Sequence, residues 1–90
     1  MSIQFDPLKD VLNIRKHGIS LAEGDGVPED PFVLVIEDKS SDGEQRFVGI
    51  GRNFLGQIRV AVYTYRGEEV RFISVRKPTA KEVNVYEKGI

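Results

Sequence analysis

Two segments of alternating residue types, 57–65 and 69–76, limit the fold of this chain more than any other feature of its sequence. Both are rich in β-branched and aromatic residues, and a period of two is typical of a strand with one covered face. The short link around Arg66 and Gly67 predicts a tight turn, so the segments should pair as an antiparallel hairpin. Because a lone hairpin is barely stable in water, the sequence predicts a larger antiparallel sheet.

The alternation also assigns the hairpin residues to the two faces of the sheet, provided that the turn has two central residues. The apolar face, which should carry the helices, holds Ile58, Val60, Val62, Ile73 and Val75. The opposite face holds Arg59, Ala61, Tyr63, Phe72, Ser74 and Arg76. A register slip of one residue would exchange these assignments. Arginines and aromatic rings on one open face are typical of single-stranded nucleic-acid binding, because bases stack on rings while guanidinium groups hold phosphates.

Helices are predicted at the two ends of the chain. Asp6 can cap a helix over residues 7–17, and its apolar stripe consists of Leu8, Val11, Leu12 and Ile14. Thr79 and Glu82 form a capping box that starts a second helix, which should run to about Lys88. These two helices flank the strands in sequence, so they are expected to pack against the sheet.

Between the helices lie two further strands and an irregular segment. Residues 32–37 and 46–52 are predicted strands, with a turn over residues 40–43. Ser20 and Glu23 form a second capping-box pattern, but it is followed at once by Gly24, Gly26 and Pro28. Because glycine and proline disfavour helix interiors, we expect one short turn and then an acidic loop.

The order of elements predicts an α+β fold, with an antiparallel sheet of about four strands and the N-terminal and C-terminal helices packed on one face. The 90 residues should form a single domain over 1–90. The absence of cysteine and the single histidine exclude disulfides, thiolate metal sites and a multi-histidine metal cage within one chain. We therefore expect no metal and no cofactor. Without a membrane-length apolar run or a signal-like N-terminus, a cytoplasmic location without membrane contact is expected.

Charge is distributed unevenly along the chain. Residues 1–45 carry four Lys or Arg and ten Asp or Glu, whereas residues 46–90 carry nine and four. A basic half in a nearly neutral protein favours a polyanionic partner such as RNA, because phosphate contacts dominate nucleic-acid affinity. The alternative is that these arginines only cover the solvent faces of strands with their aliphatic stems. RNA cleavage suits the residues present, since the 2′-hydroxyl is the nucleophile and arginines can stabilise the charge on phosphorus without metal.

The residues of several segments, taken together, resemble the BrnT-type toxins of bacterial type II toxin–antitoxin systems. The matching pieces, in chain order, are Phe5-Asp6-Pro7-x-Lys9, Asn13-x-x-Lys16-His17-Gly18, Asp30-Pro31, Asp42-Gly43-Glu44-x-Arg46, Ile50-Gly51, Thr64-x-Arg66-Gly67, Arg71-x-Ile73-Ser74-x-Arg76-Lys77 and Glu82-x-x-x-Tyr86. The resemblance covers residues 3–88 in order and spacing. It departs from the family at 24–28, where family members usually continue a helix.

This resemblance implies a RelE-like fold and a metal-independent ribonuclease that arrests translation. It also implies a BrnA-type antitoxin with a ribbon-helix-helix part, which forms a hetero-oligomer with the toxin and through which alone the pair would bind operator DNA. The alternative function is a non-catalytic RNA- or protein-binding regulatory module of the same fold.

The expected catalytic residues are Arg76, Glu44, Arg46 and His17. Arg76 should stabilise the transition state, and Glu44 with Arg46 is either a proton acceptor and phosphate clamp or only an ion pair at a turn. His17 is either an acid–base group or a helix cap, and its position at a helix C-terminus favours a raised pKa. The expected RNA-binding residues are Arg59, Tyr63, Arg71, Lys77, Lys16 and Tyr86. For Arg71 a structural salt bridge, for Lys16 a plain helix-end charge and for Tyr86 a place in the core remain open.

Overall fold

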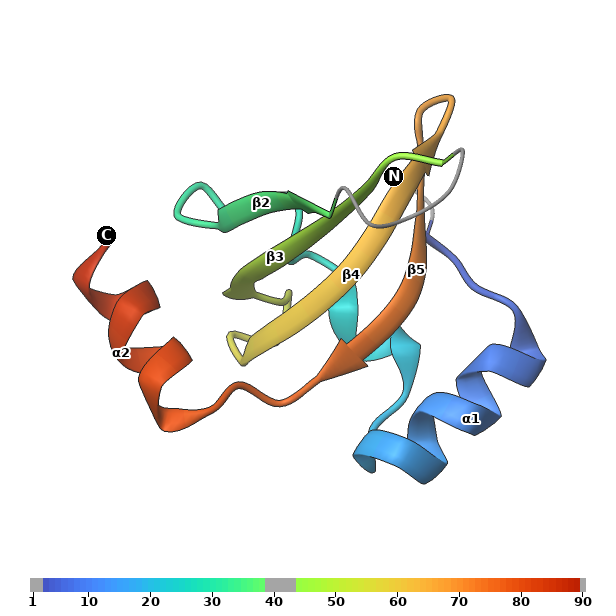
Figure 1. The fold of residues 1–90 in the computed structure, drawn as a ribbon, viewed down its shortest axis with the longest axis horizontal. Coiled ribbons are helices and arrows are strands. Elements are labelled where there is room, and N and C mark those ends of the chain that lie inside the picture. The colour runs from blue at the N-terminus through green and yellow to red at the C-terminus, as the bar shows by residue number, and fades with distance from the viewer. Residues whose placement is uncertain (1–2, 39–43, 90) are drawn as a thin grey trace.

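A five-stranded sheet in the order β1-β5-β4-β3-β2 organises the molecule (Figure 1). The computed structural model describes residues 3–38 and 44–89, so the expected turn at 40–43 lies outside the described residues. The strands are β1 (Ile3–Gln4), β2 (Leu34–Asp38), β3 (Arg46–Arg52), β4 (Ile58–Arg66) and β5 (Glu69–Arg76). The helices are α1 (Pro7–His17), the 3-10 helix η1 (Leu21–Gly24) and α2 (Ala80–Lys88).

The α+β prediction and the four antiparallel strands β2 to β5 are confirmed. The helices begin and end where their caps predict: Asp6 accepts a hydrogen bond from the Leu8 amide, and Thr79 and Glu82 complete the capping box of α2. The segment after Ser20 forms only η1 and a series of turns, as its glycines and Pro28 indicate. The sequence did not predict β1, which has two residues and pairs parallel to β5.

The assignment of the sheet faces was wrong, and a bulge in the hairpin is part of the reason. The turn does have two central residues, since Arg66 pairs with Glu69. The register then shifts between Val62 and Tyr63, where β5 carries Ile73 as an extra residue. Phe72 and Val75 therefore share a face although they are three residues apart. Before the bulge, the face predicted to be open is the buried one, since Ala61, Tyr63 and Phe72 are at most 2% exposed. After the bulge, Val75 is buried and Ser74 and Arg76 lie on the open face, as predicted.

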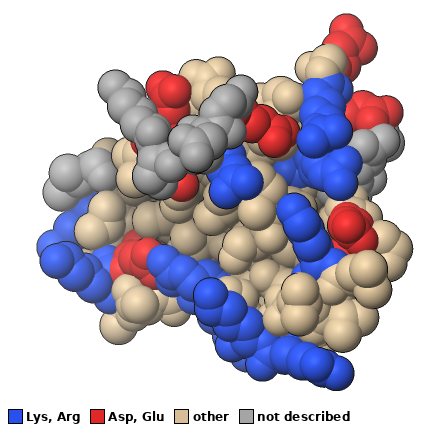
Figure 2. All heavy atoms as spheres, turned by 45° about the vertical axis from the view of Figure 1, so that its right-hand side comes forward, with Lys and Arg blue, Asp and Glu red and all other residues tan. Residues whose placement is uncertain are grey.

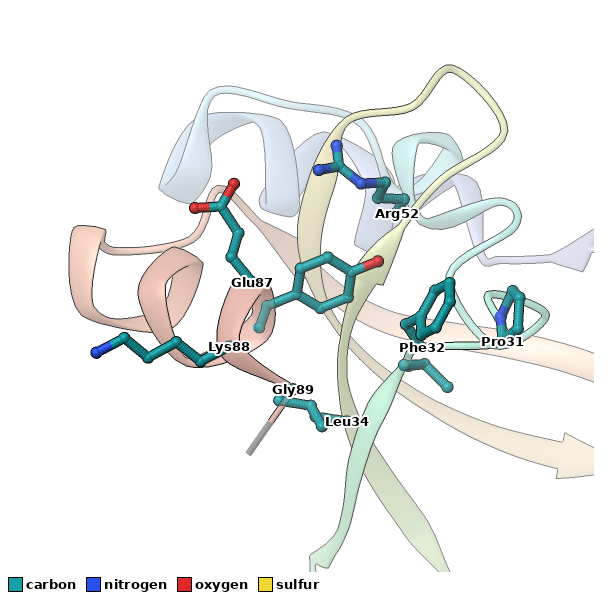
Figure 3. A pocket seen from close by; sticks show the side chains of 9 residues that line it. Pro31, Phe32, Leu34, Arg52, Glu87, Lys88 and Gly89 are labelled. Carbon is teal, nitrogen blue, oxygen red and sulfur yellow. The ribbon is translucent and has the colours of Figure 1, made fainter.

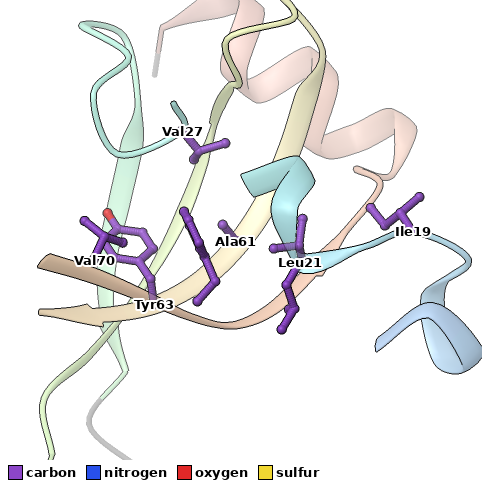
Figure 4. Packing of buried hydrophobic residues seen from close by; sticks show 8 residues of the cluster. Ile19, Leu21, Val27, Ala61, Tyr63 and Val70 are labelled. Atoms are coloured by element: carbon purple, nitrogen blue, oxygen red, sulfur yellow. The ribbon is translucent and has the colours of Figure 1, made fainter. Parts of the chain in front are cut away.

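The buried face is covered by η1 and the loop after it (Figure 4). Leu21 and Val27 are fully buried there, against strand residues that include Ala61 and Tyr63. Gly24 lies so close to the sheet that a Cβ at this position would be 2.8 Å from the Phe72 ring, so only glycine fits. Tyr63 is buried here, so its ring is part of the core and not a stacking platform for bases. The same burial raises the pKa of Tyr63 to about 12.

The two helices do not share a face of the sheet. The opposite face of the sheet carries Val48, Ile50 and Arg76, and α2 lies over one end of it, where Glu82 bonds Arg76. By contrast, α1 lies along the edge of β5, beyond the end of β1. There the Asn13 amide donates to the Val75 carbonyl oxygen at 2.8 Å, and its oxygen accepts from the Val75 amide at 3.1 Å. The Asn13 side chain thus replaces a neighbouring strand for the last part of β5.

Candidate functional site

A cleft between α1 and β5 brings together polar and basic side chains from both elements. Its volume is about 220 Å³, and it is lined by Lys9, Leu12, Asn13, Lys16, His17, Ile73 and Ser74. The bulge at Ile73 directs Ser74 to the face opposite the core, where it lies across from Val62. The Asn13 side chain fixes α1 against the same stretch of β5 through hydrogen bonds with the Val75 backbone, and these bonds hold the two walls of the cleft together.

His17 stands at the C-terminal end of α1, where Gly18 in the left-handed conformation ends the helix. Burial lowers the pKa of His17 below its usual value, and the positive charges of Lys16 and Arg76 lower it further. The expectation of a raised pKa was therefore wrong, because burial disfavours the charged imidazolium and the neighbouring cations act in the same direction. A neutral imidazole beside Arg76 is suited to accept a proton near neutral pH.

Arg76 is held in one orientation by Glu82. Both terminal nitrogens of Arg76 donate to the two Glu82 carboxylate oxygens at 2.7 Å. Glu82 also accepts from the Thr79 amide at 2.8 Å, so the carboxylate is itself fixed by the cap of α2. The hydrogen bonds from Arg76 outweigh burial and lower the pKa of Glu82 to about 2, which keeps it ionised.

This pairing leaves part of the Arg76 guanidinium for a ligand. Glu82 takes one N–H from each terminal nitrogen, and the Lys77 carbonyl oxygen lies 3.3 Å from Nη1. Within the described residues, no acceptor bonds Nε–H or the second Nη2–H of Arg76. These two N–H groups form the side edge of the guanidinium, which matches two oxygens of one phosphate.

A second basic row crosses the sheet farther along the same face. Arg46 on β3 and Arg71 on β5 flank Thr64 on β4, and the Thr64 hydroxyl donates to the Gln45 carbonyl oxygen at 2.6 Å. The Arg46 Nε is buried and has no hydrogen-bond partner among the residues that the structure describes. Because Arg71 pairs with Thr64, next to the core pair of Tyr63 and Phe72, its side chain lies on the open face of the sheet. Because Arg76 is five positions after Arg71 on β5, the two groups are about 15 Å apart along the strand.

The expected catalytic residues thus fall into two groups. His17 lines the cleft beside Lys16, an expected RNA-binding residue, and Arg76 lies near enough for its charge to act on the imidazole. Arg46 lies in the second row. Glu44 lies beyond the start of β3, and its carboxylate is 3.5 Å from the Arg66 Nε at the tip of the hairpin. The structure therefore does not bring Glu44 to Arg76, and the ion pair that it forms is with Arg66 and not with Arg46, the partner that the alternative interpretation gave it.

Three expected RNA-binding residues lie away from this face. Arg59 is on the core side of β4, where its Nε donates to the Glu23 carboxylate at 2.8 Å. Tyr63 is 2% exposed in the core. Tyr86 is buried on α2, and its hydroxyl donates to Asp30. These assignments were wrong because the buried face was taken for the open one and because Tyr86 has a partner within the fold. Lys77 is exposed and directly follows Arg76.

Two residues of the cleft, Lys9 and Ser74, were missing from the predicted site. Lys9 and Lys16 are seven residues apart, which places them two turns apart on one side of α1. That spacing was the available signal for Lys9. Ser74 was expected on the open face, where it lies. The prediction did not include the bulge, so it did not place Ser74 across from Val62.

A larger cavity, about 720 Å³, lies elsewhere, between the C-terminal end of α2 and the start of β2 (Figure 3). The Arg52 guanidinium stands 5.6 Å from the centre of the Tyr86 ring. Burial raises the pKa of Asp30, but hydrogen bonds from the Tyr86 hydroxyl and the Arg52 and Phe32 amides outweigh it and lower that pKa overall. These polar groups satisfy one another and anchor α2, so this cavity is not the candidate site.

Figure 2 shows the side of the molecule on which α1 and β5 lie, with Lys and Arg side chains around a largely uncharged centre. Such a surface attracts a phosphate backbone. Among residues 3–38 and 44–89, no three His, Cys, Asp or Glu side chains converge into a group that could hold a metal ion. The same residues contain no helix that is long and apolar enough to cross a membrane.

Comparison with known proteins identifies a family and a similar solved structure. A sequence model of the family described as the ribonuclease toxin BrnT of type II toxin–antitoxin systems matches residues 5–82. The crystal structure of the Brucella abortus ribonuclease toxin BrnT is similar, with a TM-score of 0.67 and 26% sequence identity over 88% of this chain and 97% of that chain. None of the curated proteins compared matches this chain.

Proposed function

Because the chain belongs to the family of BrnT ribonuclease toxins of type II toxin–antitoxin systems, we propose that it is a metal-independent endoribonuclease whose active site is the cleft between α1 and β5. The observation that carries this proposal is the position of the His17 imidazole in the cleft, near the Arg76 guanidinium that Glu82 holds in one orientation. A base and a phosphate-binding cation in one cleft are what cleavage through the 2′-hydroxyl requires.

In the proposed reaction, His17 accepts the proton of the 2′-hydroxyl while the 2′-oxygen forms a bond to the adjacent phosphorus. The bond from phosphorus to the 5′-oxygen breaks, and the leaving oxygen takes a proton from Lys9 or Lys16. The free edge of Arg76 holds the phosphate oxygens as negative charge develops on them. Arg71, Arg46 and Lys77 bind neighbouring phosphates, because a single strand laid along this face would pass both basic groups.

The proposed partner is a BrnA-type antitoxin with a ribbon-helix-helix part, through which the complex would bind operator DNA. An acidic antitoxin segment would cover the arginines of this face and exclude RNA from it. The basic residues around the cleft support this choice, because a segment that competes with RNA must be negatively charged. We place the pair in the cytoplasm, where RNA and ribosomes are present.

The test is incubation of the purified protein with single-stranded RNA in the presence and absence of EDTA. We expect cleavage at equal rates in both samples, with products that end in a 2′,3′-cyclic phosphate. Cleavage that stops with EDTA and returns with Mg²⁺ would contradict the proposed mechanism. Saturable RNA binding without cleavage would instead support the alternative, a non-catalytic binding module, for which the exposed arginines are the supporting observation.

A further inference from the structure

The outer side of α1 is apolar, the reverse of an ordinary surface helix. Leu8 is 75% exposed, Leu12 60% and Val11 49%, while the residue that α1 buries is Asn13. A helix packed on a core normally turns its apolar stripe inward. The expectation that this stripe packs on the sheet was therefore wrong, and the three side chains form an uncovered patch, here called the α1 stripe.

Polar contacts explain how α1 can be attached by its other side. Asn13 bonds the edge of β5. Asp10 accepts hydrogen bonds from the Ser20 hydroxyl at 2.9 Å and from the Leu21 amide at 2.7 Å. The inward side of the helix is thus satisfied without Leu8, Val11 or Leu12. Since exposing these three side chains to water is unfavourable, the patch is suited to a partner.

The charges around the α1 stripe are positive. Lys9, Arg15 and Lys16 are exposed on or beside it. The acids of the helix are engaged within the fold, since Asp6 caps it and Asp10 bonds Ser20. A second copy of this chain, packed stripe to stripe, would bring these cations against one another, which is unfavourable. A partner with acidic flanks is complementary.

We propose that the α1 stripe is a docking surface for an amphipathic helical segment with apolar residues at spacings of three and four and acidic residues on its flanks. This inference rests on the proposed function, because the partner that carries this segment is the antitoxin. The 11 residues of α1 extend for about 16 Å, so three turns of a partner helix cover them. Leu12, Lys9 and Lys16 also line the cleft, so the docked helix would block access to it.

The experiment compares the full-length double variant Leu8→Gln/Val11→Gln with Leu55→Gln, an equally mild change at a residue that is 80% exposed outside the α1 stripe. The probe is the purified product of the reading frame that adjoins this chain's own. We expect the double variant to keep its melting temperature and its RNA cleavage, and to bind the probe at least 10-fold more weakly than the wild type. Leu55→Gln should bind like the wild type.

Each other outcome overturns the inference in a distinguishable way. Equal binding by the double variant would place the docking surface elsewhere and leave the proposed function intact. A probe that does not bind the wild type would refute the proposed partner, and this inference with it. A wild-type dimer dissociated by the double substitution would assign the α1 stripe to self-association. Binding to phosphatidylglycerol vesicles that the double substitution abolishes, with binding to the probe unchanged, would assign it to a membrane surface.

Discussion

Arg76 differs from the other arginines of the sheet because its position is fixed by a carboxylate that is itself fixed. The Glu82 carboxylate bonds both terminal nitrogens of Arg76, and the Thr79 amide holds Glu82 in turn. Arg66, by comparison, reaches Glu44 at 3.5 Å, and its side chain is 56% exposed. An exposed ion pair of this kind contributes little to stability or orientation.

We expect Arg76→Ala to lower kcat for RNA cleavage by about 100-fold or more, because a fixed cation at the phosphate is lost. The protein should remain folded, since the Arg76 side chain lies outside the core cluster. Cleavage assays with circular dichroism melting measure both quantities, and Arg66→Ala is the matched control. Full activity of Arg76→Ala would show that another arginine has this role.

The protonation of His17 can be followed directly, because it is the single histidine of the chain. Burial and the charges of Lys16 and Arg76 lower its pKa, so its titration midpoint should lie below 6.5. In Arg76→Ala one of the positive charges is absent, and the midpoint should move up toward 6.5. Measurement of the imidazole proton shifts against pH by NMR tests both statements.

The same direction of shift gives the pH profile of cleavage. A base must be unprotonated, so the rate should fall as the pH drops from neutral through the lowered pKa of His17. His17→Gln should lose this acidic limb together with most of the rate. A limb that persists in His17→Gln would contradict the assignment of His17 as the base.

At the scale of elements, hydrogen bonds of the Asn13 side chain join α1 to the sheet. Asn13 is 5% exposed and bonds the Ile19 carbonyl as well as both backbone groups of Val75. Leu8, Val11 and Leu12 contribute little to the packing of α1 on the sheet, because they are exposed. The position of His17 therefore depends on the hydrogen bonds of Asn13.

We expect Asn13→Ala to destabilise the protein by about 2 kcal/mol or more, because backbone groups of β5 would lose their buried partner. Cleavage should fall as well, since one wall of the cleft is no longer held. Urea unfolding followed by circular dichroism measures the change, with Asn84→Ala on the exposed side of α2 as the control. Equal stability of the two variants would show that water or another contact replaces Asn13.

At the scale of the whole molecule, the proposal assigns the open face of the sheet to RNA and to the antitoxin in turn. A domain of 90 residues buries a smaller share of its surface on folding than a larger domain does, so its free energy of unfolding is limited. A partner that binds the folded state therefore stabilises it by mass action, by about 2.7 kcal/mol when its free concentration is 100 times Kd.

We expect the antitoxin to displace labelled RNA stoichiometrically from the inactive His17→Gln variant, and the complex to melt at a higher temperature than the toxin alone. Fluorescence anisotropy measures the displacement, and calorimetry measures the melting. If RNA and antitoxin bound together in one complex, inhibition by occlusion of this face would be refuted.

Most of the local structure follows from the sequence by itself. The limits of α1 and α2 are set by Asp6, Gly18, Thr79 and Gly89, which act on backbone groups only a few residues away. The turn of the hairpin is local in the same sense. The family also follows from the sequence, because its motifs are spread along the chain in fixed order.

The tertiary structure decided which face of the sheet is buried. Alternation separates two faces but does not say which is covered, and η1, a segment with hardly any helical signal, covers Ala61, Tyr63 and Phe72. The bulge at Ile73 then changes the side on which the last residues of β5 lie. The choice of buried face and the bulge together place Arg76 on the open face, near His17. These two residues are some 60 positions apart in the chain, so only the packing of α1 on the β5 edge could bring them together.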